Sequence, residues 1–239
     1  MAAVTEHKVI RWPAGASDDY IQARDALLEA EWALSKQIEA VAAQRRKLPP
    51  GPLIEKDYTF TEAINPSDPD PNTATKETTL TDLVADGRNL IVYHMMFAEA
   101  AETPCAGCAA LVDPLDSVAR HIEQHATFVV IGRAPLATMR SFARERGWLK
   151  ARLLSSYGSE FNVDMNVEKP LWAPGTDQQP GISVFLKDGE SGKVRHWYSQ
   201  TAHFDKDTIR AMDLLSPIWN VFDILPGGRP DWNPKNKYA

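Results

Sequence analysis

The feature that most constrains the fold of this chain is a cysteine pair that follows an apolar segment. Residues 90–97 read Leu-Ile-Val-Tyr-His-Met-Met-Phe, and Cys105-Ala-Gly-Cys108 comes a few residues later. Side chains alternate between the faces of a strand, and this segment is apolar on both, which is typical of a central strand in a sheet covered on both sides. We expect His94, within it, to be a hydrogen-bonded core histidine.

The helix predicted after Cys105 gives its two sulfurs different surroundings. Apolar side chains recur there at three- and four-residue steps, which predicts one buried face made of Cys108, Leu111, Val112, Leu115, Val118, Ala119 and Ile122. Cys108 begins this face and should point inward, whereas Cys105 should lie at the exposed tip. Backbone N–H groups and the helix dipole stabilise a thiolate there. The pattern predicts Cys105 as the attacking sulfur and Cys108 as the resolving sulfur of a redox dithiol.

The same cysteines also match a zinc-site spacing. Cys105-x2-Cys108-x12-His121-x3-His125 could supply four tetrahedral ligands. The stretch lies between two apolar segments, however, and the two histidines flank the apolar stripe, which suits solvent-facing residues. We therefore favour the dithiol and expect no metal and no cofactor.

Composition excludes some classes of function. The chain has 26 Lys and Arg against 32 Asp and Glu, a net charge of −6, which argues against a surface for nucleic acid or an anionic membrane. It has no apolar run of about 18 residues that could span a membrane and no signal-peptide pattern. Two cysteines confined to one motif suit a reducing compartment, so we expect a cytoplasmic protein.

A long helix is predicted near the N-terminus. Ser17, followed by two aspartates, is a helix start, and the helix should run to about Lys47 and stop before Pro49-Pro50. Its narrow apolar stripe consists of Leu27, Leu34, Ile38 and Val41. The stripe covers either this chain's own domain or a second copy of the chain. We take residues 1–50 as an N-terminal helical arm and a homodimer as possible.

The elements after the dithiol helix follow an alternating order. Residues 127–132 predict a second strand, and Pro135 opens a helix closed by Gly147. Ile182–Lys187 and Val194–Ser199 predict an antiparallel hairpin.

Other segments are predicted to lie at the surface. We expect an exposed loop over residues 62–78, which hold three prolines, and a solvated face made by Arg140, Arg144 and Arg146. A last helix should be capped by Asp205 or Asp207, bend at Pro217, and precede a loose polar tail over 229–239.

Longer matches extend this order to a known family. The chain resembles a family of bacterial thioredoxin-like proteins known only as a domain of unknown function. The matching segments are Arg45–Pro49, Glu55–Phe60, Leu90–Phe97, Arg133–Leu136, Tyr157–Asn162 and Pro180–Phe185. The resemblance implies an α/β thioredoxin-like fold over residues 51–228, with a central mixed sheet flanked by helices and an added N-terminal helix.

The resemblance also implies a function and a site. It implies a thiol-disulfide oxidoreductase with Cys105 as nucleophile and Cys108 as resolving thiol, acting on a disulfide-containing protein or small thiol. Pro180 corresponds to the cis-proline that faces the dithiol in thioredoxins, where exposed backbone could pair with an extended substrate. We expect Pro104, Pro180 and Gly181 to contact substrate.

Two alternatives stay open. The first is a thiol peroxidase, because Leu153-Leu154-Ser155-Ser156 is similar to a peroxiredoxin segment. Peroxiredoxins carry a Thr-x-x-Cys pattern, however, and here Thr103 stands two residues before Cys105. The second alternative is a non-catalytic binding module on a thioredoxin-like frame.

Overall fold

The computed structural model describes residues 12–201 and 212–238, which fall into two compact units. The first unit extends to Pro49 and the second begins at Pro50. Within the described residues, no helix combines the length and the apolar character needed to cross a membrane.

Helix α1, Asp18–Arg45, is the main element of the first unit. It begins as the sequence predicts, because the Ser17 hydroxyl accepts a hydrogen bond from the Tyr20 backbone N–H at 3.2 Å. None of its residues is buried, and Leu34 of the apolar stripe is 61% exposed. Leu27 and Ile38 of the stripe are exposed as well.

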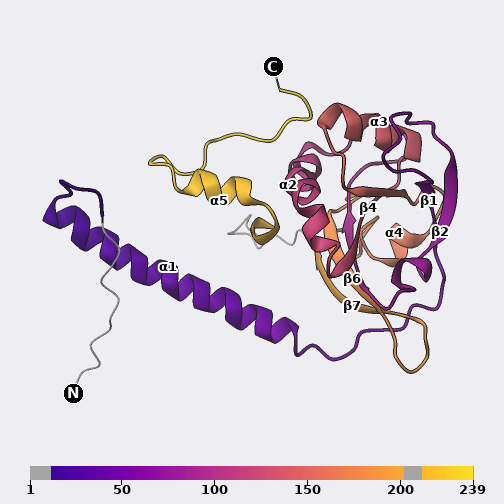
Figure 1. The fold of residues 1–239 in the computed structure, drawn as a ribbon, viewed down its shortest axis with the longest axis horizontal. Coiled ribbons are helices and arrows are strands. Elements are labelled where there is room, and N and C mark those ends of the chain that lie inside the picture. The colour runs from indigo at the N-terminus through magenta and orange to yellow at the C-terminus, as the bar shows by residue number, and fades with distance from the viewer. Residues whose placement is uncertain (1–11, 202–211, 239) are drawn as a thin grey trace. The chain divides into compact units, whose positions relative to one another are not determined.

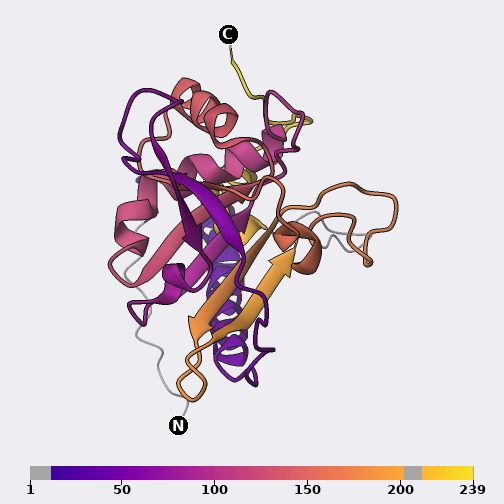
Figure 2. The ribbon, with the colours of Figure 1, turned by 90° about the vertical axis from the view of Figure 1, so that its right-hand side faces the viewer.

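The second unit is built around one seven-stranded mixed sheet (Figure 1). The strands are β1 (Thr59–Ala63), β2 (Thr75–Thr79), β3 (Asn89–His94), β4 (Ala126–Gly132), β5 (Arg152–Ser155), β6 (Gly181–Lys187) and β7 (Val194–Thr201). Their order across the sheet is β2-β1-β5-β4-β3-β6-β7. Strands β3, β4 and β5 run parallel, and the other pairings are antiparallel. Figure 2 shows the two hairpins, β1–β2 in purple and β6–β7 in orange.

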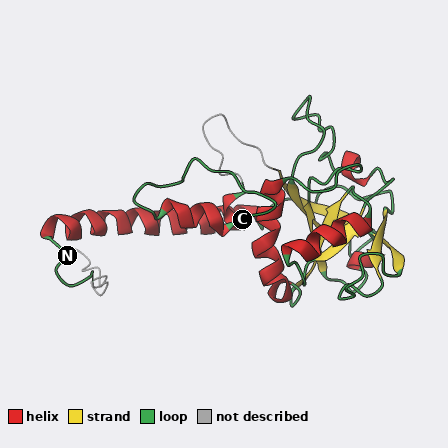
Figure 3. Ribbon diagram, turned by 90° about the horizontal axis from the view of Figure 1, so that it is seen from above, coloured by secondary structure: helices red, strands yellow, loops and turns green. Residues whose placement is uncertain are grey.

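Helices cover both faces of this sheet (Figure 3). The elements against the sheet are α2 (Ala106–Ile122), α3 (Leu136–Arg146), α4 (Phe161–Asp164) and the 3-10 turn η1 (Asp82–Val84). The C-terminal part of the chain adds the 3-10 turn η2 (Asp213–Leu215) and helix α5 (Pro217–Asp223), which has no buried residue. Successive side chains of β3 and β4 point to opposite faces of the sheet, so the core consists of two clusters of buried residues, one on each face. Tyr93 and Val130 pack with α2 and α3 on one face, whereas Val92 and Ile131 pack toward η1 and α4 on the other. A β-α-β unit followed by an antiparallel hairpin beside its first strand is the thioredoxin-like arrangement, so the predicted fold is confirmed.

The predicted exposed loop over residues 62–78 is wrong in part. Residues 75–79 form β2, which pairs with β1 at the edge of the sheet, with Glu62 opposite Lys76. The segment Thr-Lys-Glu-Thr-Thr has no apolar alternation, so no local pattern marks it as a strand. This segment is a strand because its backbone forms hydrogen bonds with β1, which the pattern of its side chains does not predict.

Two further expectations need correction. Arg140 is 7% exposed rather than solvated, and its guanidinium donates to the carbonyl oxygens of Pro66 and Asp68, at 3.3 and 2.7 Å. Pro217 is the first residue of α5 and does not bend a longer helix there. The predicted caps Asp205 and Asp207 lie outside the described residues.

Candidate active site

Cys105 is positioned by the chain that leaves the end of β3. The Met95 N–H donates to the Ile131 carbonyl oxygen at 2.8 Å, which continues the pairing with β4. The Cys105 N–H then donates to the Met96 carbonyl oxygen at 2.9 Å, so the loop between them closes on itself. Cys105 is the N-terminal cap of α2, and its carbonyl oxygen accepts from the Ala109 N–H at 3.0 Å. The central strand and the dithiol helix therefore hold this residue from both sides.

The two cysteines are free thiols in different environments. Cys105 is exposed, and Cys108 is 2% exposed. A hydrogen bond from the Cys108 thiol, together with the backbone N–H groups of Cys108 and Gly107, lowers the pKa of Cys105 from 9.0 to about 5, against the opposing effect of its partial burial. The hydrogen bond with Cys105, together with burial, raises the pKa of Cys108 well above its ordinary range. Near neutral pH the arrangement favours a thiolate on Cys105 and a thiol on Cys108.

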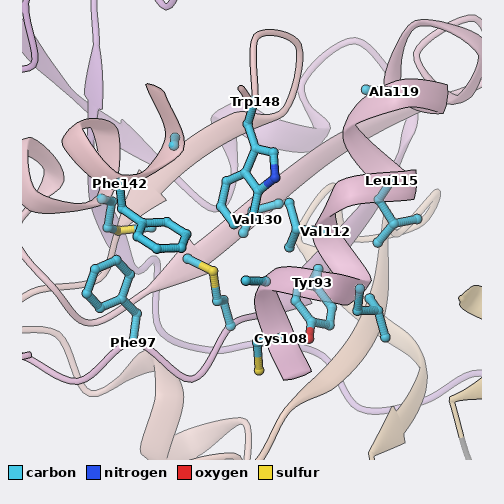
Figure 4. Packing of buried hydrophobic residues seen from close by; sticks show 14 of the residues in the cluster. Tyr93, Phe97, Cys108, Val112, Leu115, Ala119, Val130, Phe142 and Trp148 are labelled. Atoms are coloured by element: carbon cyan, nitrogen blue, oxygen red, sulfur yellow. The ribbon is translucent and has the colours of Figure 1, made fainter. Parts of the chain in front are cut away.

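Tyr93 lies beside Cys108 in the core (Figure 4). Its side chain is fully buried, and its hydroxyl group is hydrogen-bonded to the Cys108 sulfur. This bond lowers the pKa of Cys108 and so opposes burial. The Met96 N–H also donates to the Cys108 sulfur, at 3.4 Å. Cys108 thus has two donors that stabilise its anion when the proton leaves.

A pocket of about 310 Å³ opens beside the dithiol. Both cysteines line it, with Tyr93, Met96 and Leu111 from the thioredoxin-like core. Gln179 and Pro180 also line it. A further wall comes from the C-terminal segment, residues 212–238, and includes Met212, Asp213, Ser216, Ile218, Trp219, Asn233 and Pro234. This wall was not predicted from the sequence. The sequence offers one signal for it: Trp219 lies in the segment predicted as the last helix, and Trp232 lies in the segment predicted as a loose tail.

The residues predicted to contact substrate are placed as follows. Pro180 lines the pocket, but the Gln179–Pro180 peptide bond is trans, so the predicted cis-proline is wrong. Gly181 is the first residue of β6 and is paired on both sides, with His94 of β3 and Thr201 of β7. The backbone at this point is already used within the sheet. Pro104 is buried, and its carbonyl oxygen accepts a hydrogen bond from the Asn236 side chain at 2.9 Å.

The C-terminal segment is tied to the core rather than loose. The Arg146 guanidinium donates to the carbonyl oxygens of Lys235 and Asn236, at 2.9 and 2.7 Å. The ring of Trp232 packs against Trp219 with centroids 6.0 Å apart. The prediction of a loose tail is therefore wrong. The polar composition of residues 229–239 does not indicate that they make these long-range contacts.

The zinc alternative is not supported by the geometry. His121 lies near the C-terminal end of α2, and a rise of about 1.5 Å per residue places it about 20 Å from the cysteines. The described residues contain no group of three or more His, Cys, Asp or Glu side chains that could hold a metal ion.

His94 lies on the opposite face of β3 from the dithiol side chains. It is 1% exposed, and its Nε2 atom is 2.8 Å from the Ser183 hydroxyl oxygen. Burial, with the charge of His196, lowers its pKa to about 3, so it is neutral at physiological pH. The prediction of a hydrogen-bonded core histidine is confirmed.

Solved structures that are similar to part of this chain include peroxiredoxins. A mutant PrxQ from Xylella fastidiosa has 15% sequence identity and a TM-score of 0.46, over 70% of this chain and 93% of its own. Peroxidoxin BcpB from Mycobacterium tuberculosis has 19% identity and a TM-score of 0.44, over 70% of this chain and 96% of its own. No curated protein matches the chain. The fold assignment rests on the strand order given above.

A family model extends over nearly the whole sequence. The model described as "Bacterial protein of unknown function (DUF899)" matches residues 10–239, which include the dithiol helix and the C-terminal segment beside it. The chain thus belongs to this family of bacterial proteins of unknown function.

Proposed function

We propose that this protein is a thiol-disulfide oxidoreductase that uses Cys105 as nucleophile and Cys108 as resolving thiol. The observation that carries the proposal is the asymmetry of the pair. The exposed sulfur has a pKa of about 5, and the buried sulfur beside it keeps its proton. A thiolate that is accessible and a thiol that is close but protected are the two groups that dithiol exchange needs.

The reaction follows in two balanced steps. The Cys105 thiolate attacks one sulfur of a substrate disulfide and forms a mixed disulfide, and the other substrate sulfur leaves as a thiolate. Cys108 then loses its proton to that thiolate or to solvent and attacks the Cys105 sulfur, which releases the second substrate thiol. The substrate gains two electrons and the protein keeps an intramolecular disulfide. An external dithiol reductant returns the protein to its starting state.

The first experiment separates the two sulfurs. In Cys108→Ser the first step is intact and the second is lost, so a model disulfide should remain attached to Cys105 and be visible as added mass. Cys105→Ser is the matched control and should acquire no adduct. A Cys108→Ser protein that never forms a mixed disulfide, or an equal adduct on the control, would contradict the proposal.

A second candidate is a thiol peroxidase. The apolar pocket beside the thiolate supports it, because this pocket could also hold an organic hydroperoxide. Attack of the thiolate on the peroxide would give a sulfenic acid on Cys105 and release an alcohol, and Cys108 would then form the disulfide with loss of water. Peroxide should in this case leave a sulfenic acid on Cys105 in Cys108→Ser, and consumption of hydroperoxide should exceed that of the disulfide.

A further inference from the structure

We infer that the dithiol acts on small, apolar, uncharged organic disulfides and not on extended polypeptides. This inference rests on the proposed disulfide exchange and names its substrate class. Three independent observations support it: the pocket is small and lined by apolar side chains, its described lining has no lysine or arginine, and the backbone beside Pro180 is already hydrogen-bonded within the chain.

The size of the pocket limits its occupant. Its volume of about 310 Å³ is at the lower end of the range for small-molecule sites. Apolar side chains of Met96, Leu111, Met212, Ile218 and Trp219 surround the space next to Cys105. A disulfide with short aliphatic arms is small enough for this volume, and transfer of its apolar surface from water into the pocket is favourable.

The wall contributed by the C-terminal segment is held in place by specific contacts. Arg229 is hydrogen-bonded to Asp213 and Asp223, and its guanidinium carbon lies 5.5 Å from the centre of the Trp219 ring. The edge of Trp219 is also packed against Phe222, with ring centroids 6.0 Å apart. The Trp219 ring is therefore fixed by its neighbours, and the pocket is built before substrate arrives.

The charge of the pocket disfavours anionic substrates. Among its described lining residues Asp213 is the one carboxylate, and none is a lysine or an arginine. Glutathione disulfide carries net negative charge, and its carboxylates would meet no lysine or arginine among the lining residues, because Arg229 lies behind them on Asp213 and Asp223. A neutral disulfide pays no such cost.

The backbone that could pair with an extended substrate is already occupied. The Gln179 N–H, next to Pro180, donates to the Val167 carbonyl oxygen at 2.8 Å. The Lys169 N–H donates to the Asp177 carbonyl oxygen at 2.9 Å, so residues 167–169 pair with residues 177–179 of the same chain. Addition of a peptide strand at this point would require that pairing to break.

The test compares three disulfides in one assay with the reduced full-length protein. The probes are diethyl disulfide, glutathione disulfide and native insulin, and the readout is the rate at which the Cys105–Cys108 disulfide forms. Each rate is divided by the rate of dithiothreitol with the same probe, which removes differences in intrinsic reactivity. We expect the normalised rate with diethyl disulfide to exceed the other two by at least about tenfold.

Matched tryptophan variants test the wall. Trp219→Ala should reduce the preference for diethyl disulfide by about tenfold. Trp172→Ala is the control, because Trp172 is also partly buried but does not line this pocket. If Trp219→Ala unfolds the C-terminal segment, Ile218→Trp tests the same wall by filling it, and the preference should fall there too.

The outcomes separate this inference from the proposed function. A normalised preference for glutathione disulfide or insulin, equal rates with all three probes, or equal effects of the two tryptophan variants would overturn the substrate class while leaving disulfide exchange in place. Failure of all three probes to oxidise the dithiol would overturn the proposed function itself.

Discussion

The Asn236 side-chain amide donates a hydrogen bond to the Pro104 carbonyl oxygen, at 2.9 Å, between residues 132 positions apart in the sequence. Pro104 immediately precedes Cys105, so this bond ties the C-terminal segment to the residue next to the exposed sulfur. Two carbonyl oxygens of the same segment also accept from Arg146. Residues 235–236 are thus held close to the reactive thiol, although they are far from it in the sequence.

Asn236→Ala should weaken the attachment of the C-terminal segment next to Cys105. We expect the free energy of unfolding to fall by about 1 kcal/mol, the contribution of one hydrogen bond, and Cys105 to react faster with a bulky maleimide. Urea unfolding and the rate of alkylation measure the two effects. Lys237→Ala is the control in the same segment, because its ion pair with Glu145 is solvent-exposed and should change both quantities little. Equal effects of the two variants would contradict the prediction.

The low pKa of Cys105 predicts the pH dependence of its chemistry. Because the pKa is lowered to about 5, the rate of alkylation by iodoacetamide should rise with pH through a midpoint near pH 5 and level off above it. An ordinary cysteine thiol would have its midpoint near pH 9. Mass analysis should place this modification on Cys105, and Cys105→Ser should lack it. A midpoint above pH 8 would remove the basis for the attacking role.

Tyr93→Phe should slow the resolving step. The Tyr93 hydroxyl group lowers the pKa of Cys108, so its loss should leave Cys108 a weaker acid and reduce the fraction of resolving thiolate. We expect the mixed disulfide on Cys105 to persist several-fold longer, whereas the pH dependence of Cys105 alkylation should move less. Stopped-flow release of the second substrate thiol measures this. An unchanged lifetime would show that the hydroxyl group serves packing alone.

Gly132→Ala should destabilise the fold beside the site. A Cβ atom at this position would lie 3.1 Å from Met139 Cε and 3.3 Å from Phe97 Cβ. Overpacking of this kind costs about 1–3 kcal/mol. Gly189→Ala is the matched control, because a Cβ there meets nothing within 4 Å. Urea unfolding of both variants should show the loss for Gly132→Ala only.

Much of the fold could be predicted because the structure of some segments depends on their own sequence pattern. The apolar run at 90–97 forms β3, and the three- and four-residue periodicity after Cys105 forms α2 with Cys108 inward. In both segments the period predicts most of the side chains that face the core. Val118, predicted on the buried face of α2, is an exception, because it is 42% exposed. The family and the thioredoxin-like fold are confirmed on the same segments.

Local pattern failed where a segment's structure depends on a distant partner. Strand β2 is a polar sequence that exists because β1 pairs with it, and Arg140 is buried because the carbonyl oxygens of a loop about 70 residues away meet its guanidinium. The Pro180 peptide bond is trans even though the neighbouring order matches thioredoxins. Strand pairing and burial of a polar group are properties of two segments together.

The central strand, the dithiol and the inward and outward positions of its two sulfurs can be read from the amino-acid order, because the spacing of two cysteines on one helix needs no other part of the chain. The surroundings of the outer sulfur depend on the folding of the whole chain. The pocket wall at Trp219, the occupied backbone at Gln179 and the hydrogen bond from Asn236 join residues more than 70 positions from Cys105 to its surroundings. Such contacts follow from how the whole chain packs, and no periodicity within one segment encodes them.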